Sequence, residues 1–126
     1  MYWFFLRFSL ENTNGDYVFQ PISNPRCTLT GHLQNETLEE LIIPGSLCVS
    51  SNDINHCKVS YYVTAIGSNS FSGAKKLKYV KFLNPTKFER IEESAFKDCT
   101  SLEVFNLTNA VKLNLIGDNA FSGCTS

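Results

Sequence analysis

The sequence predicts an α/β solenoid, in which short parallel strands and short helical turns repeat along one axis. Three observations predict it. The motif IGSNSF at residues 66–71 recurs twice at a step of 25 residues, and a period of about 20 to 50 residues indicates stacked structural units. Each unit carries a short alternation of apolar and polar residues, which is typical of a strand. An aromatic segment that can fold back on itself precedes the first unit, where a solenoid needs a cap.

The repeated positions form the expected core. They are Ile66, Ser70 and Phe71, then Ile91, Ala95 and Phe96, then Ile116, Ala120 and Phe121. Because one unit cannot bury its apolar face alone, we expect equivalent side chains to stack into columns, isoleucine over isoleucine and phenylalanine over phenylalanine. Burying one such phenylalanine stabilises the fold by about 1.5–3 kcal/mol.

The expected strand of each unit follows an L-x-x-V-x-F spacing. The spacing occurs at Leu77, Val80 and Phe82, with variants at Leu102, Phe105 and Leu107 and at Leu38, Leu41 and Ile43. The residues between these alternate with them, as the two faces of a strand require. We expect one strand per unit, paired in parallel with the strand of the next unit at roughly 4.8 Å.

A turn is expected after each repeated isoleucine. Asn69, Ser94 and Asn119 suit an N-cap or a turn before a single helical turn. The position that ends this turn is Gly73, Asp98 or Gly123. Glycine adopts positive φ readily there, and Asp98 must tolerate the same conformation if that position is left-handed.

The pattern I-G-x-x-[AS]-F-x-x-[CA]-x-x-L-x-x-V-x-F resembles the BspA-like, Treponema-type class of leucine-rich repeats. It stands at residues 66–82 and again at 91–107, where Glu92 replaces the glycine and Phe105 and Leu107 replace the last two positions. The resemblance covers residues 38–126 and implies a leucine-rich-repeat right-handed solenoid. It also implies surface proteins of bacteria and of parasitic protists such as trichomonads, where such repeats serve adhesion and protein binding. This chain departs from the family in being short and in ending at Ser126 within a unit.

The N-terminal segment predicts a β-hairpin cap. Residues 1–10 alternate as a strand does, Asn14-Gly15 fits a type I′ turn, and Tyr17 and Phe19 begin the returning strand. The alternative is a damaged secretion signal, because the segment is apolar but Arg7 interrupts it and no small-residue cleavage site follows. We therefore expect a cap over residues 1–30 and leucine-rich repeats over 31–126, the last repeat incomplete.

Two further segments interrupt the regular pattern. Residues 20–37 carry Pro21, Pro25 and Gly31 and are expected to form turns. The unit after Leu38 is longer than its successors, and its extra length contains KVSYYVT at residues 58–64, which predicts a protruding hairpin leading into Ile66. Insertions of this kind often carry binding, so segment 44–65 is a candidate binding element; a lengthened unit without a ligand is the alternative.

Composition excludes several classes of function. The 126 residues fit one small domain, and 43% hydrophobic with 18% charged residues is ordinary for a globular chain. A net charge of −1 argues against nucleic acid as a partner, since that requires a basic surface. No stretch reaches the roughly 18 apolar residues of a transmembrane helix.

The cysteines predict no metal site. Cys99 and Cys124 share a repeat position with Ala74, which indicates buried, reduced thiols. Cys48 and Cys57 lie outside the repeat and could form a disulfide in an oxidising compartment. The cysteine and histidine spacings do not match those of zinc sites, and no cofactor-binding motif occurs, so we expect no metal and no cofactor.

The expected function is binding rather than catalysis. No catalytic motif occurs, so we expect the chain not to be an enzyme. The residues between the buried strand positions are expected to face outward on the concave sheet; they are Glu40, Ile42, Tyr79, Lys81, Val104 and Asn106. Tyrosine gives a large, rigid contact area, which favours Tyr79 as the anchor. The alternative is that these are merely tolerated surface residues.

The context of the chain is inferred from the same features. Two sequons, at Asn35 and Asn106, permit glycosylation after export, and Asn35 is the better candidate because it lies in a turn-rich segment. We expect an adhesion module at the cell surface or secreted, with a protein or another host or extracellular macromolecule as partner. The alternative is a cytoplasmic leucine-rich-repeat scaffold or a spacer without its own ligand. The C-terminal unit is expected to be covered by further repeats or by self-association.

Overall fold

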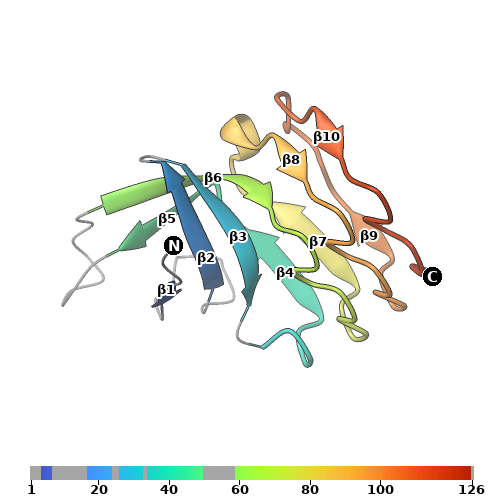
Figure 1. Ribbon diagram of the computed structural model, residues 1–126. Helices are drawn as coiled ribbons and strands as arrows, with labels where there is room; N and C mark the ends of the chain where they lie inside the picture. Colours follow the sequence, from blue (N-terminus) through green and yellow to red (C-terminus); the bar gives the residue numbers. More distant parts are fainter. Residues whose placement is uncertain (1–3, 7–16, 24–25, 33, 50–58, 126) are drawn as a thin grey trace.

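The computed structural model describes residues 4–6, 17–23, 26–32, 34–49 and 59–125 (Figure 1). Its elements are β1 (Phe4–Leu6), β2 (Tyr17–Ser23), β3 (Arg26–His32), β4 (Glu40–Ile43), β5 (Ser46–Val49), β6 (Val59–Ile66), β7 (Tyr79–Phe82), the 3₁₀ helix η1 (Pro85–Lys87), β8 (Arg90–Ile91), β9 (Val104–Phe105) and β10 (Leu115–Ile116). Across these ranges, η1 is the only helical element.

The strands form two sheets. One has the order β1-β2-β3-β6-β8-β10, with β5 also paired to β6, and the other has the order β4-β7-β9. In Figure 1, β4, β7 and β9 lie behind β3, β6, β8 and β10. The pairings β3-β6-β8-β10 and β4-β7-β9 are parallel. Each 25-residue unit therefore contributes a strand to both sheets.

The expectation of one strand per unit is wrong. Ile91 and Ile116 lie in the second strand of their units, β8 and β10, and pair in register with each other and with Ile66. These strands are two residues long. The prediction rested on the L-x-x-V-x-F spacing, which covers only the strand that a unit contributes to the smaller sheet.

The predicted columns of side chains are confirmed. The ring centroids of Phe71 and Phe96 lie 5.3 Å apart with an interplanar angle of 8°. Those of Phe96 and Phe121 lie 5.7 Å apart at 4°. Ile66 and Ile91 are fully buried beside them. The core thus lies between the two sheets and continues from unit to unit.

The segment after each isoleucine is a series of turns and not the helical turn that was expected. Asn69, Ser94 and Asn119 have φ of 59°, 57° and 59°, and Asp98 also has a left-handed φ of 59°. A left-handed residue diverts the chain and prevents the helix from continuing. Backbone N–H groups bond to the next unit instead, from Phe71 to Ala95 O at 2.8 Å and from Gly73 to Lys97 O at 2.7 Å.

The N-terminal strands extend the larger sheet. β1 pairs antiparallel with β2 and β2 antiparallel with β3, while Asn14-Gly15 lies outside the described residues. Two strands thus occupy much of the region where turns were expected. Pro21 is accommodated beside a shift of register in β2, and β3 alternates, with Cys27 and Leu29 buried. That alternation was a signal in the sequence that the prolines and the glycine obscured.

The expected hairpin in segment 44–65 has its two strands. β5 pairs antiparallel with β6, with Ser46 opposite Tyr62 and Leu47 opposite Tyr61. Residues 50–58, which connect them, lie outside the described residues. The expected pairing of Cys48 with Cys57 falls there too, because Cys57 and the side chain of Cys48 are not described.

Candidate functional site

The three-stranded sheet presents one outer face, which contains the six side chains expected to bind there. We call it the outer sheet face; its members are Glu40, Ile42, Tyr79, Lys81, Val104 and Asn106. The register places Glu40 opposite Tyr79 and Tyr79 opposite Val104. Ile42 lies opposite Lys81. Asn106 follows β9, and its N–H donates to Val80 O at 2.9 Å. This bond keeps Asn106 in the same column as Ile42 and Lys81.

The inward residues of the same strands fix this arrangement. Leu41 and Val80 are fully buried and Phe105 packs against the core. A slip of register by one residue would turn these side chains to solvent and bring the outer ones into the core. The positions of the two outer columns therefore follow from burial on the other side of the sheet.

The chemistry of the outer sheet face is mixed. Tyr79 is 41% exposed and Val104 50%. Lys81 Nζ lies 3.4 Å from Glu40 Oε1, and Lys78 Nζ lies 4.0 Å from Glu39 Oε1 beside it. Exposed ion pairs of this kind contribute about 0–1 kcal/mol or less, so they orient the side chains more than they stabilise the fold. An aromatic and two aliphatic side chains among paired charges suit contact with a macromolecular surface.

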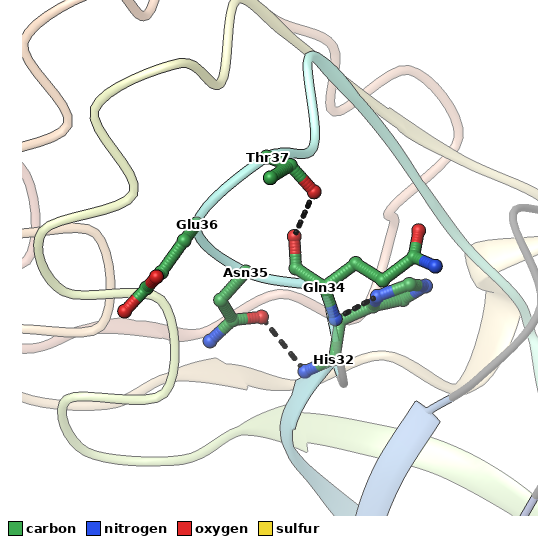
Figure 2. Close-up of a pocket in the computed structure, with 5 residues that line it drawn as sticks. All are labelled: His32, Gln34, Asn35, Glu36 and Thr37. Carbon is green, nitrogen blue, oxygen red and sulfur yellow. Dashed lines mark hydrogen bonds between the residues drawn. The ribbon is translucent and has the colours of Figure 1, made fainter.

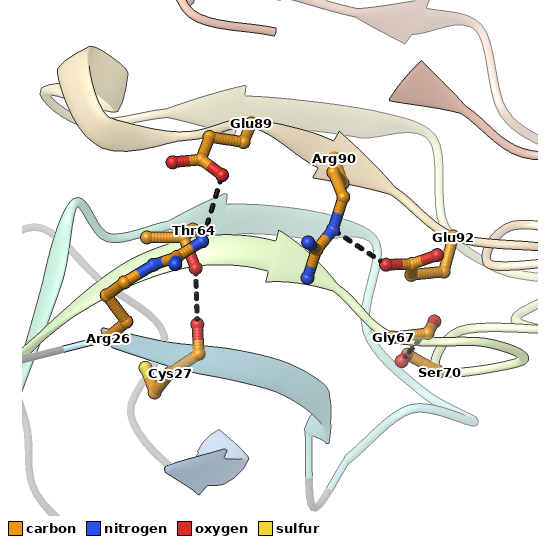
Figure 3. Close-up of polar contacts among 8 residues, drawn as sticks. All are labelled: Arg26, Cys27, Thr64, Gly67, Ser70, Glu89, Arg90 and Glu92. Carbon is orange, nitrogen blue, oxygen red and sulfur yellow. Dashed lines mark hydrogen bonds and ion pairs between the residues drawn. The ribbon is translucent and has the colours of Figure 1, made fainter. Parts of the chain in front are cut away.

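The outer face of the larger sheet carries polar contacts that the sequence did not predict. Arg26 Nη2 donates to Glu89 Oε1 at 2.9 Å, across strands β3, β6 and β8 (Figure 3). Arg90 Nε lies 2.8 Å from Glu92 Oε1. Arg26 and Glu89 are 63 residues apart. Only the sheet order brings them together, so no local pattern in the sequence pointed to this pair.

A cavity of about 380 Å³ lies at the loop after β3 (Figure 2). It is lined by His32, Gln34, Asn35, Glu36 and Thr37. His32 Nδ1 accepts the N–H of Gln34 at 3.0 Å, and Asn35 Oδ1 accepts the N–H of His32 at 2.9 Å. Asn35 Nδ2 donates to Ser70 O at 3.0 Å. The first two bonds fix the loop itself, and the bond to Ser70 holds the loop to the next unit. This part of the lining is therefore structural.

The described thiols are not placed for catalysis. Cys27, Cys99 and Cys124 are free. Burial raises the pKa of Cys27 and of Cys99 to about 12, and it raises the pKa of Cys124 as well. The thiols of Cys99 and Cys124 donate to the carbonyls of Phe71 and Phe96, each at 3.2 Å. A thiol that stays protonated at neutral pH is a poor nucleophile.

No group of three or more His, Cys, Asp or Glu side chains in the described ranges is arranged to hold a metal ion. No helix in those ranges has the length and apolarity needed to cross a membrane.

Two solved structures share the fold of this chain. A leucine-rich repeat protein from Bacteroides ovatus has a TM-score of 0.57 at 21% identity, over 85% of this chain and 31% of that chain. A leucine rich cell surface protein from Faecalibacterium prausnitzii has a TM-score of 0.57 at 18% identity, over 94% of this chain and 34% of that chain. The chain thus spans about a third of the length of these proteins, and the likeness shows a leucine-rich-repeat fold.

A family profile also matches the chain and identifies the type of leucine-rich repeat. No curated protein matches the chain significantly. The profile described as a BspA type leucine rich repeat region matches residues 41–126, in six copies. This range is more than half of the chain and contains both parallel sheets from β4 onward, so the chain belongs to the BspA-type leucine-rich repeat family.

Proposed function

We propose that the chain is a non-enzymatic protein-binding and adhesion module, which binds a protein or another host or extracellular macromolecule. Binding takes place on the outer sheet face, with help from segment 44–65. The family supports an interaction role. The observation that carries the proposal is the pair of registered columns, in which Tyr79 and Lys81 are exposed at the centre of the sheet. Repeat proteins sum many shallow contacts along such a surface.

The wider architecture belongs to the same proposal. The chain is a right-handed solenoid, and its N-terminal hairpin caps the first unit. The burial of Tyr17 and Phe19 supports this cap, because both rings are completely covered. The division into a cap over residues 1–30 and repeats over 31–126 remains a prediction, and β3 (Arg26–His32) crosses it.

The proposed location is the cell surface or the extracellular medium. One structural relative is described as a cell surface protein. A disulfide between Cys48 and Cys57 belongs to this proposal, since it needs an oxidising compartment. A cytoplasmic scaffold or a spacer is the alternative, and it predicts that these thiols are reduced in protein isolated from its source. Mass spectrometry of that protein distinguishes the two locations.

The outer sheet face is tested with variants of similarly exposed residues on the two sheets. Tyr79 on the smaller sheet is 41% exposed, and Leu115 on the larger sheet, outside segment 44–65, is 43% exposed. The immobilised domain is used to capture partners from extracts of host cell surfaces, and each captured partner is then titrated against Tyr79→Ala, Lys81→Glu, Leu115→Ala and Lys76→Glu. We expect Tyr79→Ala and Lys81→Glu to weaken binding about tenfold each, which corresponds to about 1.4 kcal/mol.

The controls define the result that contradicts this function. Leu115→Ala and Lys76→Glu change exposed side chains outside the proposed binding surface and should leave affinity unchanged. Thermal unfolding checks that all four variants are folded. Equal affinity of the wild type and both face variants for every captured partner would show that the outer sheet face does not bind. Failure to capture any partner would favour the spacer.

A further inference from the structure

The two sequons of the chain differ in the state of their asparagine amides. In the first, Asn35-Glu36-Thr37, the amide of Asn35 is bonded at both ends, and Figure 2 shows the bond between its oxygen and His32. Its Oδ1 accepts from His32 N–H and its Nδ2 donates to Ser70 O. The side chain is half-buried and ties the loop to the following unit. A sugar attached to Asn35 Nδ2 would therefore disrupt the contact with Ser70 O.

In the second sequon, Asn106-Leu107-Thr108, the amide nitrogen is available. Asn106 is exposed at the end of β9, on the outer sheet face. Its Oδ1 accepts two hydrogen bonds from Thr108, from N–H at 2.9 Å and from Oγ1–H at 2.6 Å. Both bonds use only the oxygen, and Nδ2 makes no hydrogen bond to the described part of the chain. The amide is thus oriented by its own sequon, with its nitrogen toward solvent.

We propose that Asn106, and not Asn35, carries an N-linked glycan when the chain crosses a membrane that contains an oligosaccharyltransferase and its lipid-linked oligosaccharide. In that reaction, Nδ2 of Asn106 forms a bond to C1 of the sugar. The bond from C1 to the pyrophosphate oxygen of the lipid carrier breaks, and the amide proton passes to a base of the transferase. The sequon supplies the threonine hydroxyl that this class of enzyme requires.

The glycan has a consequence for binding that rests on the proposed function. Asn106 lies in one column with Lys81 and Ile42, so a sugar there covers the β9 side of the outer sheet face. The β4 side, with Glu40, stays open. Removing the glycan is therefore expected to raise affinity for a partner bound on this face.

The glycan itself is tested without any partner. The chain is expressed behind a cleavable secretion signal in a eukaryotic host, and glycan release in ¹⁸O water followed by mass spectrometry reports each occupied asparagine. We expect one glycan on the secreted wild type, lost in Asn106→Gln and in Thr108→Ala. Thr37→Ala destroys the other sequon without touching the amide of Asn35, and it should leave the glycan in place.

The outcomes separate this inference from the proposed function. A glycan on Asn35 of the secreted protein, or an unmodified Asn106 in both the secreted and the retained protein, overturns the assignment. Neither result bears on Tyr79 and Lys81, because the assay contains no partner. Conversely, a Tyr79→Ala variant that binds normally leaves the assignment of Asn106 intact.

Discussion

The inner units of the stack bury a side chain that the last unit leaves half exposed. Ile66 and Ile91 are completely buried, whereas Ile116, one step further in the same column, is 50% exposed. Their residue type and their place in the repeat are identical. The difference shows that burial comes from the neighbouring unit and not from the unit itself, as expected for stacked repeats.

The N-terminal unit has the cover that the C-terminal unit lacks in the described range. Tyr17 of β2 is fully buried and its hydroxyl donates to Ile42 O of β4 at 2.5 Å. At the other end, Leu115 and Val104 are 43% and 50% exposed on the last strands of the two sheets. The two ends therefore offer matched positions at which removal of a side chain should have unequal costs.

The largest difference is expected in the phenylalanine column. Phe96 is completely buried and stacks between Phe71 and Phe121. Phe96→Ala should lower the free energy of unfolding by about 3–5 kcal/mol, because it leaves a cavity on both sides. Phe121→Ala, at the half-covered end, should cost clearly less. Urea unfolding measures both, and equal losses would mean that stacking does not determine burial.

The loop after β3 should show the next largest effect. Asn35→Ala leaves the N–H of His32 and the carbonyl of Ser70 without their partner, which should cost about 1–3 kcal/mol. Asn106→Ala removes an exposed amide that bonds only within its own turn, and it should cost less than about 1 kcal/mol. Thermal unfolding of the two variants compares them. Equal midpoints would contradict the role of Asn35 as a link between units.

A smaller effect should separate two tyrosines. Tyr17→Phe removes the hydroxyl that bonds to Ile42 O and should cost about 0.5–1.5 kcal/mol. Tyr79→Phe should be close to neutral, because that side chain is exposed on the outer sheet face. Chemical denaturation resolves the difference. If both substitutions are neutral, the hydroxyl of Tyr17 does not hold the N-terminal strands to β4.

The effect expected in the thiol column is absent at neutral pH and appears only as the pH rises. Burial raises the pKa of Cys99 to about 12 in the folded protein, whereas an unfolded cysteine ionises near pH 8.5. The folded state thus keeps the proton longer, so this contribution to stability is complete below about pH 8.5 and is lost as pH rises toward 12. Cys99→Ala, which copies Ala74, should lose less stability than the wild type between pH 8 and 10.5. Parallel pH profiles of the two proteins would refute the shift.

The sequence predicted those features that repeat with a long, strong signal. The column of Phe71, Phe96 and Phe121 followed from the 25-residue step, because each unit packs against its neighbours through the same positions. The strands β8 and β10 were not predicted, because they lie outside the L-x-x-V-x-F spacing that predicted β7 and β9. β3 was missed although it alternates, because Pro21, Pro25 and Gly31 favoured turns.

The candidate site was predictable only in part. Alternation placed the six residues of the outer sheet face on one side of the sheet, but it could not reveal the ion pair between Glu40 and Lys81 on neighbouring strands. The contact between Arg26 and Glu89 depends on the order of strands far apart in the chain. The different states of the Asn35 and Asn106 amides likewise depend on tertiary contacts and local turns.

The isoleucine column tests the central claim most directly, because one substitution is made at two equivalent places. Ile91→Ala and Ile116→Ala are compared by urea unfolding at constant pH and protein concentration. We predict a loss of about 2–5 kcal/mol for Ile91→Ala and less than half of that loss for Ile116→Ala. Equal losses at the two positions would contradict the claim that each unit is buried by its neighbour.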